Sequence, residues 1–426
     1  MRVMKTYMHA TTAFPIDAVR GRFPSLEITD NGRARVYLDN PAGTQVPSSV
    51  AQAAASALIQ SNANLGGYFV TSHAAERIVE NAHQAMATFL NARSYREIII
   101  AQSMTNLTFH VSRSIGRTLK AGDEIVITRM EHDGNVAPWL ALAEDRGLKV
   151  RWVPFDQKTW AVEPDAFARA LSERTRIVAL NYASNLTGSI NDVGTLTKMA
   201  KDRSALVYID AVQSAPHGIT DVQAIGCDFL ACSSYKFYGP HLGILWGREE
   251  LLRDLYAYKV RPLTNDLPWK FETGTPQIEL QAALGAAIDY FRWLGEAVGS
   301  RGEPREQVEA ALRAVVQWER ALVQRLLTGL AALPGVTIYG IEDPTHFDRR
   351  VPTVSFRHSR LAPANIAKAL ADENIFVWSG NNYALEVVRS LDIDEEEGVV
   401  RIGIAHYNTP AEIDQTLSKL TDILKD

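Results

Sequence analysis

The chain has 426 residues, more than one hydrophobic core usually holds, so two domains are expected. Its 44 basic and 49 acidic residues give a net charge of −5 and form no basic run, which argues against a nucleic-acid partner. The two cysteines, Cys227 and Cys232, cannot build a disulfide framework or a four-ligand zinc site, and no stretch is apolar for long enough to serve as a signal peptide or a membrane span. We therefore expect a soluble, cytoplasmic protein without a metal centre or a membrane partner.

The first two thirds of the chain have the pattern of an α/β domain. Residues 1–30 are expected to pack with the C-terminal domain, and an apolar run at 36–39 is followed by a loop and an Ala-rich helix at 47–60. Short apolar runs then alternate with helical patterns, as buried parallel strands do. The seven runs are 97–101, 124–128, 150–153, 177–180, 206–209, 229–232 and 244–246. The pattern predicts a large domain at 31–295 with a mainly parallel sheet of about seven strands.

The last third of the chain changes pattern. Helices expected at 279–294 and 305–330 lead into four strand-like runs with helices between them. These runs are 336–339, 353–356, 375–378 and 399–402. The final helix has Thr409 as its N-cap and Glu412 to complete a capping box. We expect a smaller α+β domain at 296–426.

Lys236 is the most informative residue, because it stands in a Ser-rich turn that follows an apolar run and ends in Gly239. Asp210 ends another run, and Gln213 comes three residues later. A lysine amine with a lowered pKa can form a Schiff base, and a carboxylate can keep a pyridine nitrogen protonated. Together they predict a pyridoxal phosphate (PLP) site, in which the ring takes up electrons when a Cα bond breaks. Taken alone, Lys236 would be read as a solvated loop residue and Asp210 as a helix cap.

A PLP phosphate needs the N–H groups at a helix N-terminus and a few hydroxyls. Ser103, Met104 and Thr105 follow the run that ends at residue 101 and open a helical stretch. Ser233, at the start of the lysine turn, can add a hydroxyl. We predict that these residues hold the phosphate, although such caps also open ordinary helices.

Three more polar residues complete the predicted site. His132 and Asn185 follow two further strands, and the carboxyl ends of parallel strands share one rim. The imidazole can stack on the pyridine ring and relay protons, and the amide can reach the phenolic oxygen or the substrate carboxylate. Arg401, on a small-domain strand, suits the α-carboxylate of an amino acid, its alternative being an ion pair with the acidic loop at 392–397.

Over nearly its whole length, the chain resembles the class V aminotransferase group of fold-type I PLP enzymes, and most closely the cysteine desulfurases. The matching segments are Tyr37-Leu38-Asp39, Asn91-Ala92-Arg93, Gly122-Asp123-Glu124, Glu131-His132 with Asn135, Ser184-Asn185 with Gly188, Asp210 with Gln213, Ser233 with Lys236 and Gly239-Pro240, Gly274-Thr275-Pro276, and Arg401 with Tyr407-Asn408-Thr409.

The resemblance implies a role for each candidate residue. Lys236 would be the Schiff-base lysine, Asp210 would contact the pyridine nitrogen, and Gln213 the phenolic oxygen. The other implied roles are ring stacking by His132, phosphate binding by Thr105 and Ser233, a place near the substrate for Asn185, and carboxylate binding by Arg401. The resemblance further implies a homodimer, in which Thr275 reaches the phosphate of the partner subunit.

Two departures from the desulfurases bear on function. Where they have a mobile loop with Gly-His-His-Cys, this chain has Gly380-Asn381-Asn382-Tyr383, so a phenol replaces the persulfide-forming thiol. The histidine usually next to the lysine is Tyr235. Tyrosine cannot accept sulfur from cysteine, so Tyr383 is predicted as a substrate contact. Cys227 and Cys232 flank an apolar run and are expected to be structural.

We predict a PLP-dependent enzyme that acts on a small amino acid through an external aldimine, with Lys236 and His132 as catalytic residues. A Cβ–X (C–S) lyase or an aminotransferase is the favoured activity. An epimerase, and a cysteine desulfurase that uses an external thiol, stay open as alternatives. A catalytically silent binding module would be expected to have lost Lys236 or Asp210, and an oxidoreductase would need a Gly-x-Gly-x-x-Gly motif that the early strands lack.

Overall fold

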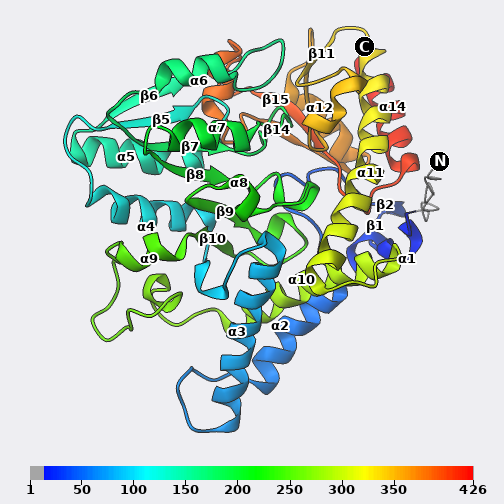
Figure 1. Cartoon of the computed structure of the whole chain (residues 1–426). Helices are drawn as coiled ribbons and strands as arrows, with labels where there is room; N and C mark the ends of the chain where they lie inside the picture. Colours follow the sequence, from blue (N-terminus) through cyan, green and yellow to red (C-terminus); the bar gives the residue numbers. More distant parts are fainter. Residues whose placement is uncertain (1–13, 426) are drawn as a thin grey trace, which may run out of the picture.

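The computed structural model describes residues 14–425, and a seven-stranded mixed sheet forms the middle of its large domain (Figure 1). The strand order is β4-β10-β9-β8-β7-β5-β6, and β10 runs opposite to the other six strands, which share one direction. The strands are β4 (Ile98–Ala101), β5 (Glu124–Thr128), β6 (Lys149–Val153), β7 (Thr175–Asn181), β8 (Leu206–Asp210), β9 (Phe229–Ser233) and β10 (Gly243–Gly247). Each predicted run forms one of them, so the predicted α/β fold with a mainly parallel sheet is confirmed.

Helices cover both faces of this sheet, which explains why its strands are apolar almost throughout. Alternate residues of β4 enter different hydrophobic clusters, Ile98 and Ile100 one of them and Ile99 the other. The Ile99 face is covered by α4 (Met104–Gly116) and α5 (Ala137–Arg146). The opposite face is covered by α3 (Val70–Leu90), α6 (Pro164–Ala170) and α7 (Val193–Lys201).

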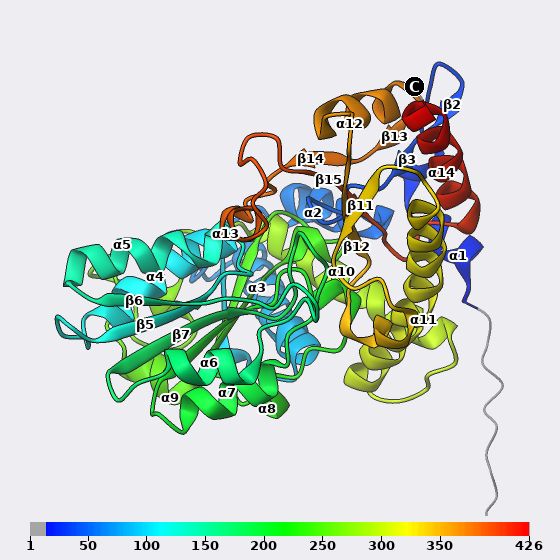
Figure 2. The same cartoon turned by 90° about the horizontal axis from the view of Figure 1, so that it is seen from above.

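Two long helices link the large domain to the C-terminal one. Helix α10 (Ile278–Ala297) packs against α2 (Ser48–Gln60), α3 and α11 (Pro304–Ala331). Val308 of α11 lies in the core of the large domain, and Leu326, further along the same helix, lies in the core of the small one. Helix α11 therefore belongs to both domains, and Figure 2 shows it running beside the small-domain sheet.

The small domain is an antiparallel sheet with helices packed on it. Its strand order is β11-β12-β15-β14. The strands are β11 (Val336–Tyr339), β12 (Thr353–His358), β14 (Trp378–Gly380) and β15 (Val399–Gly403), and the helices are α12 (Pro363–Asp372) and α14 (Pro410–Lys425). The predicted capping box of α14 is confirmed, because the Glu412 N–H donates to Thr409 Oγ1 at 3.2 Å and the Thr409 N–H donates to Glu412 Oε2 at 2.9 Å.

The single strand predicted at 375–378 is wrong in its extent. β13 (Ile375–Phe376) pairs in parallel with β3 (Val36–Tyr37), whereas β14 pairs with β15, so the chain changes partner at Val377. Val36 and Leu38 lie in the hydrophobic core of the small domain. This packing places residues 36–38 with the small domain, while the predicted limits at 30 and 295 stay predictions.

The remaining elements are short. They are α1 (Ile16–Arg20), β1 (Thr29–Asp30), β2 (Arg33–Ala34), α8 (Val222–Ile225), α9 (Glu249–Asp254) and α13 (Leu385–Ser390), with 3-10 turns between elements. Within residues 14–425, no helix combines the length and the apolar character that a bilayer crossing requires.

Candidate active site

A cavity of about 620 Å³ lies where the rim of the large-domain sheet meets the small domain. Loops after β4, β5, β7, β8 and β9 form one wall, and residues of β14 and β15 contribute to the other. Ten of the eleven predicted site residues line it, namely Met104, Thr105, His132, Asn185, Asp210, Gln213, Ser233, Lys236, Tyr383 and Arg401. Residues up to 297 positions apart in the chain, 104 to 401, therefore converge on one space.

Lys236 ends the 3-10 turn η5 (Ser234–Lys236), directly after β9. Its side chain is buried, and Nζ donates a hydrogen bond to the Pro41 carbonyl oxygen. Burial, helped by the positive charge of Arg401, lowers the pKa of Lys236 to about 7. A large fraction of this amine is therefore neutral near pH 7, as attack on a carbonyl carbon requires.

Asp210, the last residue of β8, is buried on the same rim. Its Oδ1 accepts a hydrogen bond from the Val212 N–H at 2.9 Å, which fixes the carboxyl group. Burial raises the pKa of Asp210 to about 6, while the nearby Lys236 charge opposes that rise. A carboxylate in such a place has much to gain from a cationic partner, such as a protonated pyridine nitrogen.

Helix α4 begins at the cavity, and a glycine in the neighbouring strand β10 leaves room for its first residues. Its N-cap Ser103 accepts a hydrogen bond from the Asn106 N–H at 3.2 Å, and by helix geometry the N–H groups of Met104 and Thr105 have no partner within the helix. A Cβ on Gly243 of β10 would come within 2.2 Å of the Met104 nitrogen. Glycine at this position thus allows the helix N-terminus to lie against the sheet, where N–H groups suit an anion.

His132 forms part of the wall beside this helix start. Its Nδ1 accepts a hydrogen bond from the Gly134 N–H at 2.9 Å, which leaves the ring proton on Nε2. Burial and the charges of Lys236 and Arg401 lower the pKa of His132 to about 4, so the ring is neutral near pH 7. On the ring lies Tyr383, with centroids 5.5 Å apart and planes 28° apart.

Arg401 projects from β15 and is buried. Its Nη2 lies 3.3 Å from Asp39 Oδ1, and its Nη1 donates to the Asn185 carbonyl oxygen at 3.3 Å. The alternative of an ion pair with the acidic loop is wrong, because the carboxylate that pairs with Arg401 is Asp39, and Glu397 of that loop pairs with Arg357. Arg401 lines the cavity, and within residues 14–425 its guanidinium makes only these two hydrogen bonds, both of them long.

Three buried polar atoms of cavity-lining residues have no hydrogen-bond partner within the described chain. They are Arg401 Nε, Asn185 Oδ1 and Asn382 Oδ1. Buried polar groups are normally satisfied, so their clustering marks a place for a polar ligand. The amide of Asn185 also donates to the Asn382 carbonyl oxygen at 2.7 Å, which joins the rim to the loop of the small domain.

That loop, residues 380–383, has an unusual backbone. Gly380, Asn382 and Tyr383 have φ values of 121°, 54° and 57°, and the latter two are non-glycine residues in the left-handed region. The Tyr383 carbonyl oxygen accepts a hydrogen bond from the Asp133 N–H at 2.7 Å. The loop is thus docked on the rim, and the Tyr383 side chain stays 73% exposed.

Sequence reasoning missed several residues at the cavity, among them Asp39, Pro41, Trp378 and Asn382. Asp39 and Pro41 belong to a segment whose sequence predicts only a strand and a loop. The Pro41 carbonyl oxygen accepts hydrogen bonds from Lys236 Nζ and from Gln213 Nε2, the latter at 2.9 Å. A backbone acceptor leaves no side-chain signal in a sequence. For Asp39 the sequence does contain a signal, since Tyr37-Leu38-Asp39 is one of the segments that carry the resemblance to the family.

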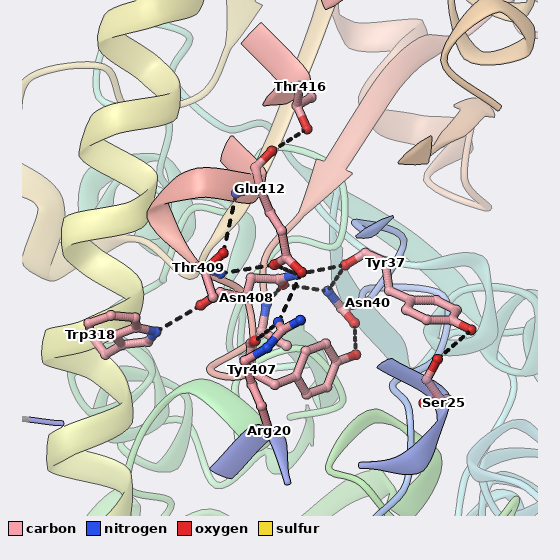
Figure 3. Close-up of polar contacts among 11 residues, drawn as sticks. Arg20, Ser25, Tyr37, Asn40, Trp318, Tyr407, Asn408, Thr409, Glu412 and Thr416 are labelled. Carbon is pink, nitrogen blue, oxygen red and sulfur yellow. Dashed lines mark hydrogen bonds and ion pairs between the residues drawn. The ribbon is translucent and has the colours of Figure 1, made fainter. Parts of the chain in front are cut away.

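A buried polar network fixes the loop that carries these groups (Figure 3). Asn40 Nδ2 donates to the Gly403 carbonyl oxygen at 2.7 Å, and Asn40 Oδ1 accepts from the Tyr407 hydroxyl. Asn408 Nδ2 continues the network to Glu412 Oε2 at 3.1 Å, and Arg20 Nη1 donates to Glu412 Oε1 at 2.9 Å. The network ties Asp39 and Pro41 to β15 and to the start of α14.

The two thiols lie away from the cavity. Cys227 and Cys232 are both fully buried in the hydrophobic core of the large domain, and neither lines the cavity. Burial raises the pKa of both thiols far above its ordinary value, so neither is a ready nucleophile.

Thr275 is the one predicted site residue that does not line the cavity. It is exposed and lines a separate hollow with Gly274 and Phe109, and Phe109 also lines the cavity. The expected contact of Thr275 with the phosphate of a partner subunit stays a prediction.

A family model described as Aminotransferase class-V matches residues 36–416. The chain belongs to the class V aminotransferase family. Relatives in this family include a probable cysteine desulfurase of Synechocystis sp., 34% identical over 94% of both chains. An aminotransferase-like protein of Gibberella zeae is 31% identical over 97% of this chain and 100% of its own.

Solved structures agree with this class V assignment. The apo cysteine desulfurase of Thermococcus onnurineus NA1 has a TM-score of 0.85 and 28% identity, covering 98% of this chain and 99% of its own. A cysteine desulfurase of Escherichia coli has a TM-score of 0.83 and 25% identity, covering 97% and 100%. The chain is thus a PLP-dependent class V enzyme related to the cysteine desulfurases, and the predicted family, fold and cofactor are confirmed.

Proposed function

We propose that this class V enzyme is a Cβ–X lyase, which removes the Cα proton of a small amino acid and expels a substituent from Cβ. The observation that carries the proposal is the pairing of Tyr383 with His132 on the cavity wall while both thiols are buried elsewhere. A persulfide on Cys227 or Cys232 would have no path to a substrate in this cavity.

The residues present fit PLP. The N–H groups of Met104 and Thr105 and the Ser233 hydroxyl would hold the phosphate, and Asp210 would hold the pyridine nitrogen. When bound, PLP supplies a ring that takes up the electron pair left by a broken Cα bond. Lys236 would attach to it covalently, as the low pKa of this amine allows.

Lys236 and Arg401 would act on the two ends of the amino acid. The guanidinium of Arg401 binds the α-carboxylate and orients the Cα–H bond toward the Lys236 amine, which takes the proton. An amine with a pKa of about 7 is close to the optimum for a base that works at neutral pH.

A proton donor for the leaving group favours elimination over the other outcomes. The neutral His132 ring with its proton on Nε2 and the Tyr383 hydroxyl both belong to cavity-lining residues. The Tyr383 hydroxyl could protonate the leaving atom without using Lys236, whereas the neutral imidazole of His132 is too weak an acid to do so. Aminotransfer is the second candidate, because Lys236, with its pKa of about 7, could carry the proton by itself from the substrate Cα to the carbon atom on the other side of the amino nitrogen.

We also propose a homodimer whose sites share residues. Thr275 is exposed and lines a hollow that shares Phe109 with the cavity. From there its hydroxyl could bind the cofactor phosphate in the site of a second copy. The proposal is supported by the Gly274-Thr275-Pro276 segment, which is one of the segments that resemble the family pattern and from which the shared site is inferred.

The decisive experiment incubates the purified holoenzyme with β-chloroalanine, S-methylcysteine, cysteine and alanine, without any amino acceptor. A lyase forms pyruvate and ammonia from the substrates that carry a leaving group and none from alanine. Pyruvate from alanine only when a keto acid is added would replace the proposal with an aminotransferase, and racemised alanine would replace it with an epimerase. The Lys236→Ala variant serves as the control for chemistry outside the site.

A further inference from the structure

We propose that the Cβ substituent that leaves is bulky and apolar, and that Trp378 and Tyr383 form its binding surface. This inference rests on the proposed lyase function and names its substrate class. The substrates would be S-alkyl or S-aryl derivatives of cysteine with large apolar groups.

Trp378 lies beside the carboxylate-binding arginine. It stands directly opposite Arg401 in the antiparallel pair of β14 and β15, and side chains of opposite residues project from the same face of a sheet. Trp378 lines the same cavity and is 52% exposed. An amino acid held by Arg401 through its carboxylate would therefore carry its side chain close to the indole ring.

Tyr383 offers a second aromatic surface at the same opening. Its ring stacks on His132 by one face and is 73% exposed. The half-buried Phe109 and Val212 also line the cavity. Large aromatic side chains left in contact with water at a concave site gain most when an apolar group covers them.

The charged groups of the cavity do not suit a charged substituent. Arg401 is engaged by the carboxylate, and Asp210 by the pyridine nitrogen. Asp133 also lines the cavity, where burial and the charge of Glu386 raise the pKa of its carboxyl group and the Arg389 charge opposes that rise, so this carboxyl group already has a cationic neighbour. An apolar substituent is therefore the better match.

The overall step balances without an oxidant or a reductant. The Cα–H and Cβ–S bonds break, the sulfur leaves with the bonding electrons and takes a proton, and water then hydrolyses the remaining enamine. One S-substituted cysteine and one water give one thiol, one pyruvate and one ammonia.

The test compares S-benzylcysteine, S-methylcysteine and S-(2-aminoethyl)cysteine as substrates of the holoenzyme, measured as kcat/KM for pyruvate formation. We expect S-benzylcysteine to be at least about tenfold better than S-methylcysteine, as for several methylene groups placed in an apolar site. Trp378→Ala should remove about 10- to 100-fold of kcat/KM for S-benzylcysteine and change S-methylcysteine by less than about threefold. Trp378→Phe should restore most of the loss, and Tyr95→Ala, outside the cavity, should change neither substrate.

A second readout does not need turnover. Phenylalanine and alanine are titrated into the holoenzyme, and binding is followed by cofactor absorbance. We expect phenylalanine to bind about tenfold tighter than alanine, and Trp378→Ala to abolish the difference. Equal affinities, equal kcat/KM for the benzyl and methyl substrates, or a preference for the aminoethyl substrate would overturn the inference. Absence of elimination together with a Trp378-dependent preference for phenylalanine would overturn the lyase function alone.

Discussion

Arg401→Ala is the variant for which the structure gives the clearest expected magnitude. The guanidinium is 4% exposed, and its two contacts to Asp39 and Asn185 are both 3.3 Å long, so the protein itself uses little of its hydrogen-bonding capacity. Truncating one partner of a buried charge pair costs about 2–5 kcal/mol. At about 1.4 kcal/mol per tenfold, substrate affinity should fall roughly 30- to 4000-fold.

The assay titrates the holoenzyme with an unreactive or slowly reacting amino acid and follows cofactor absorbance. Arg401→Lys should fall between the parent and Arg401→Ala, because a lysine keeps the charge and loses the planar fork. Arg325→Ala, which removes an exposed arginine paired with Asp414, is the matched control and should not change affinity. An affinity of Arg401→Ala within about twofold of the parent, with cofactor bound and the circular dichroism spectrum unchanged, would refute the assignment.

Four further predictions concern the cofactor and the thiols. Lys236→Ala should purify without PLP that borohydride can fix to the chain, and a fixed cofactor in that variant would show that another amine is used. In the parent apoenzyme, the rate of PLP attachment should rise about tenfold between pH 6 and pH 8. The reason is that the Lys236 amine, with a pKa of about 7, goes from about a tenth neutral to about nine tenths neutral over this range. A rate that does not change with pH would contradict the lowered pKa. The holoenzyme should sediment as a dimer, and Thr275→Ala should weaken PLP binding roughly tenfold, as for one hydrogen bond to a charged group; a fully active monomer would exclude the shared site. The double variant Cys227→Ala with Cys232→Ala should keep its lyase rate within about threefold, and mass spectrometry of the parent during turnover should find no persulfide; a persulfide on either thiol would return the chain to the desulfurases.

The sheet and the lysine turn could be predicted because their signals are local. Strands such as β5 and β8 are buried on both faces, so their apolar runs follow from burial alone. Asp210 ends β8 and Lys236 lies in the turn that follows β9. Because the carboxyl ends of parallel strands share one rim, their positions in the sequence place them together without knowledge of the tertiary packing.

Other features depended on tertiary contacts that a local pattern does not contain. The run from Ile375 to Trp378 has no turn residue in it, and only pairing with two different strands divides it into β13 and β14. The place of Trp378 beside Arg401 follows from strand register, which a sequence specifies only through the packed sheet. The contact of Pro41 with Lys236 links positions 195 apart through a backbone oxygen.

The two walls of the cavity belong to two hydrophobic cores. The lysine turn, Asp210 and the start of α4 rest on the core of the large domain, whereas β14 and β15, which carry Trp378 and Arg401, rest on the core that includes Val400 and Ile402. Changes at Trp378 in β14 or in the loop at 380–383 can thus alter which amino acid is accepted while the residues predicted to hold the cofactor keep a core of their own. Selection for new substrates, in nature or in a directed library, would accordingly act on β14 and the loop at 380–383, while the lysine turn stays unchanged.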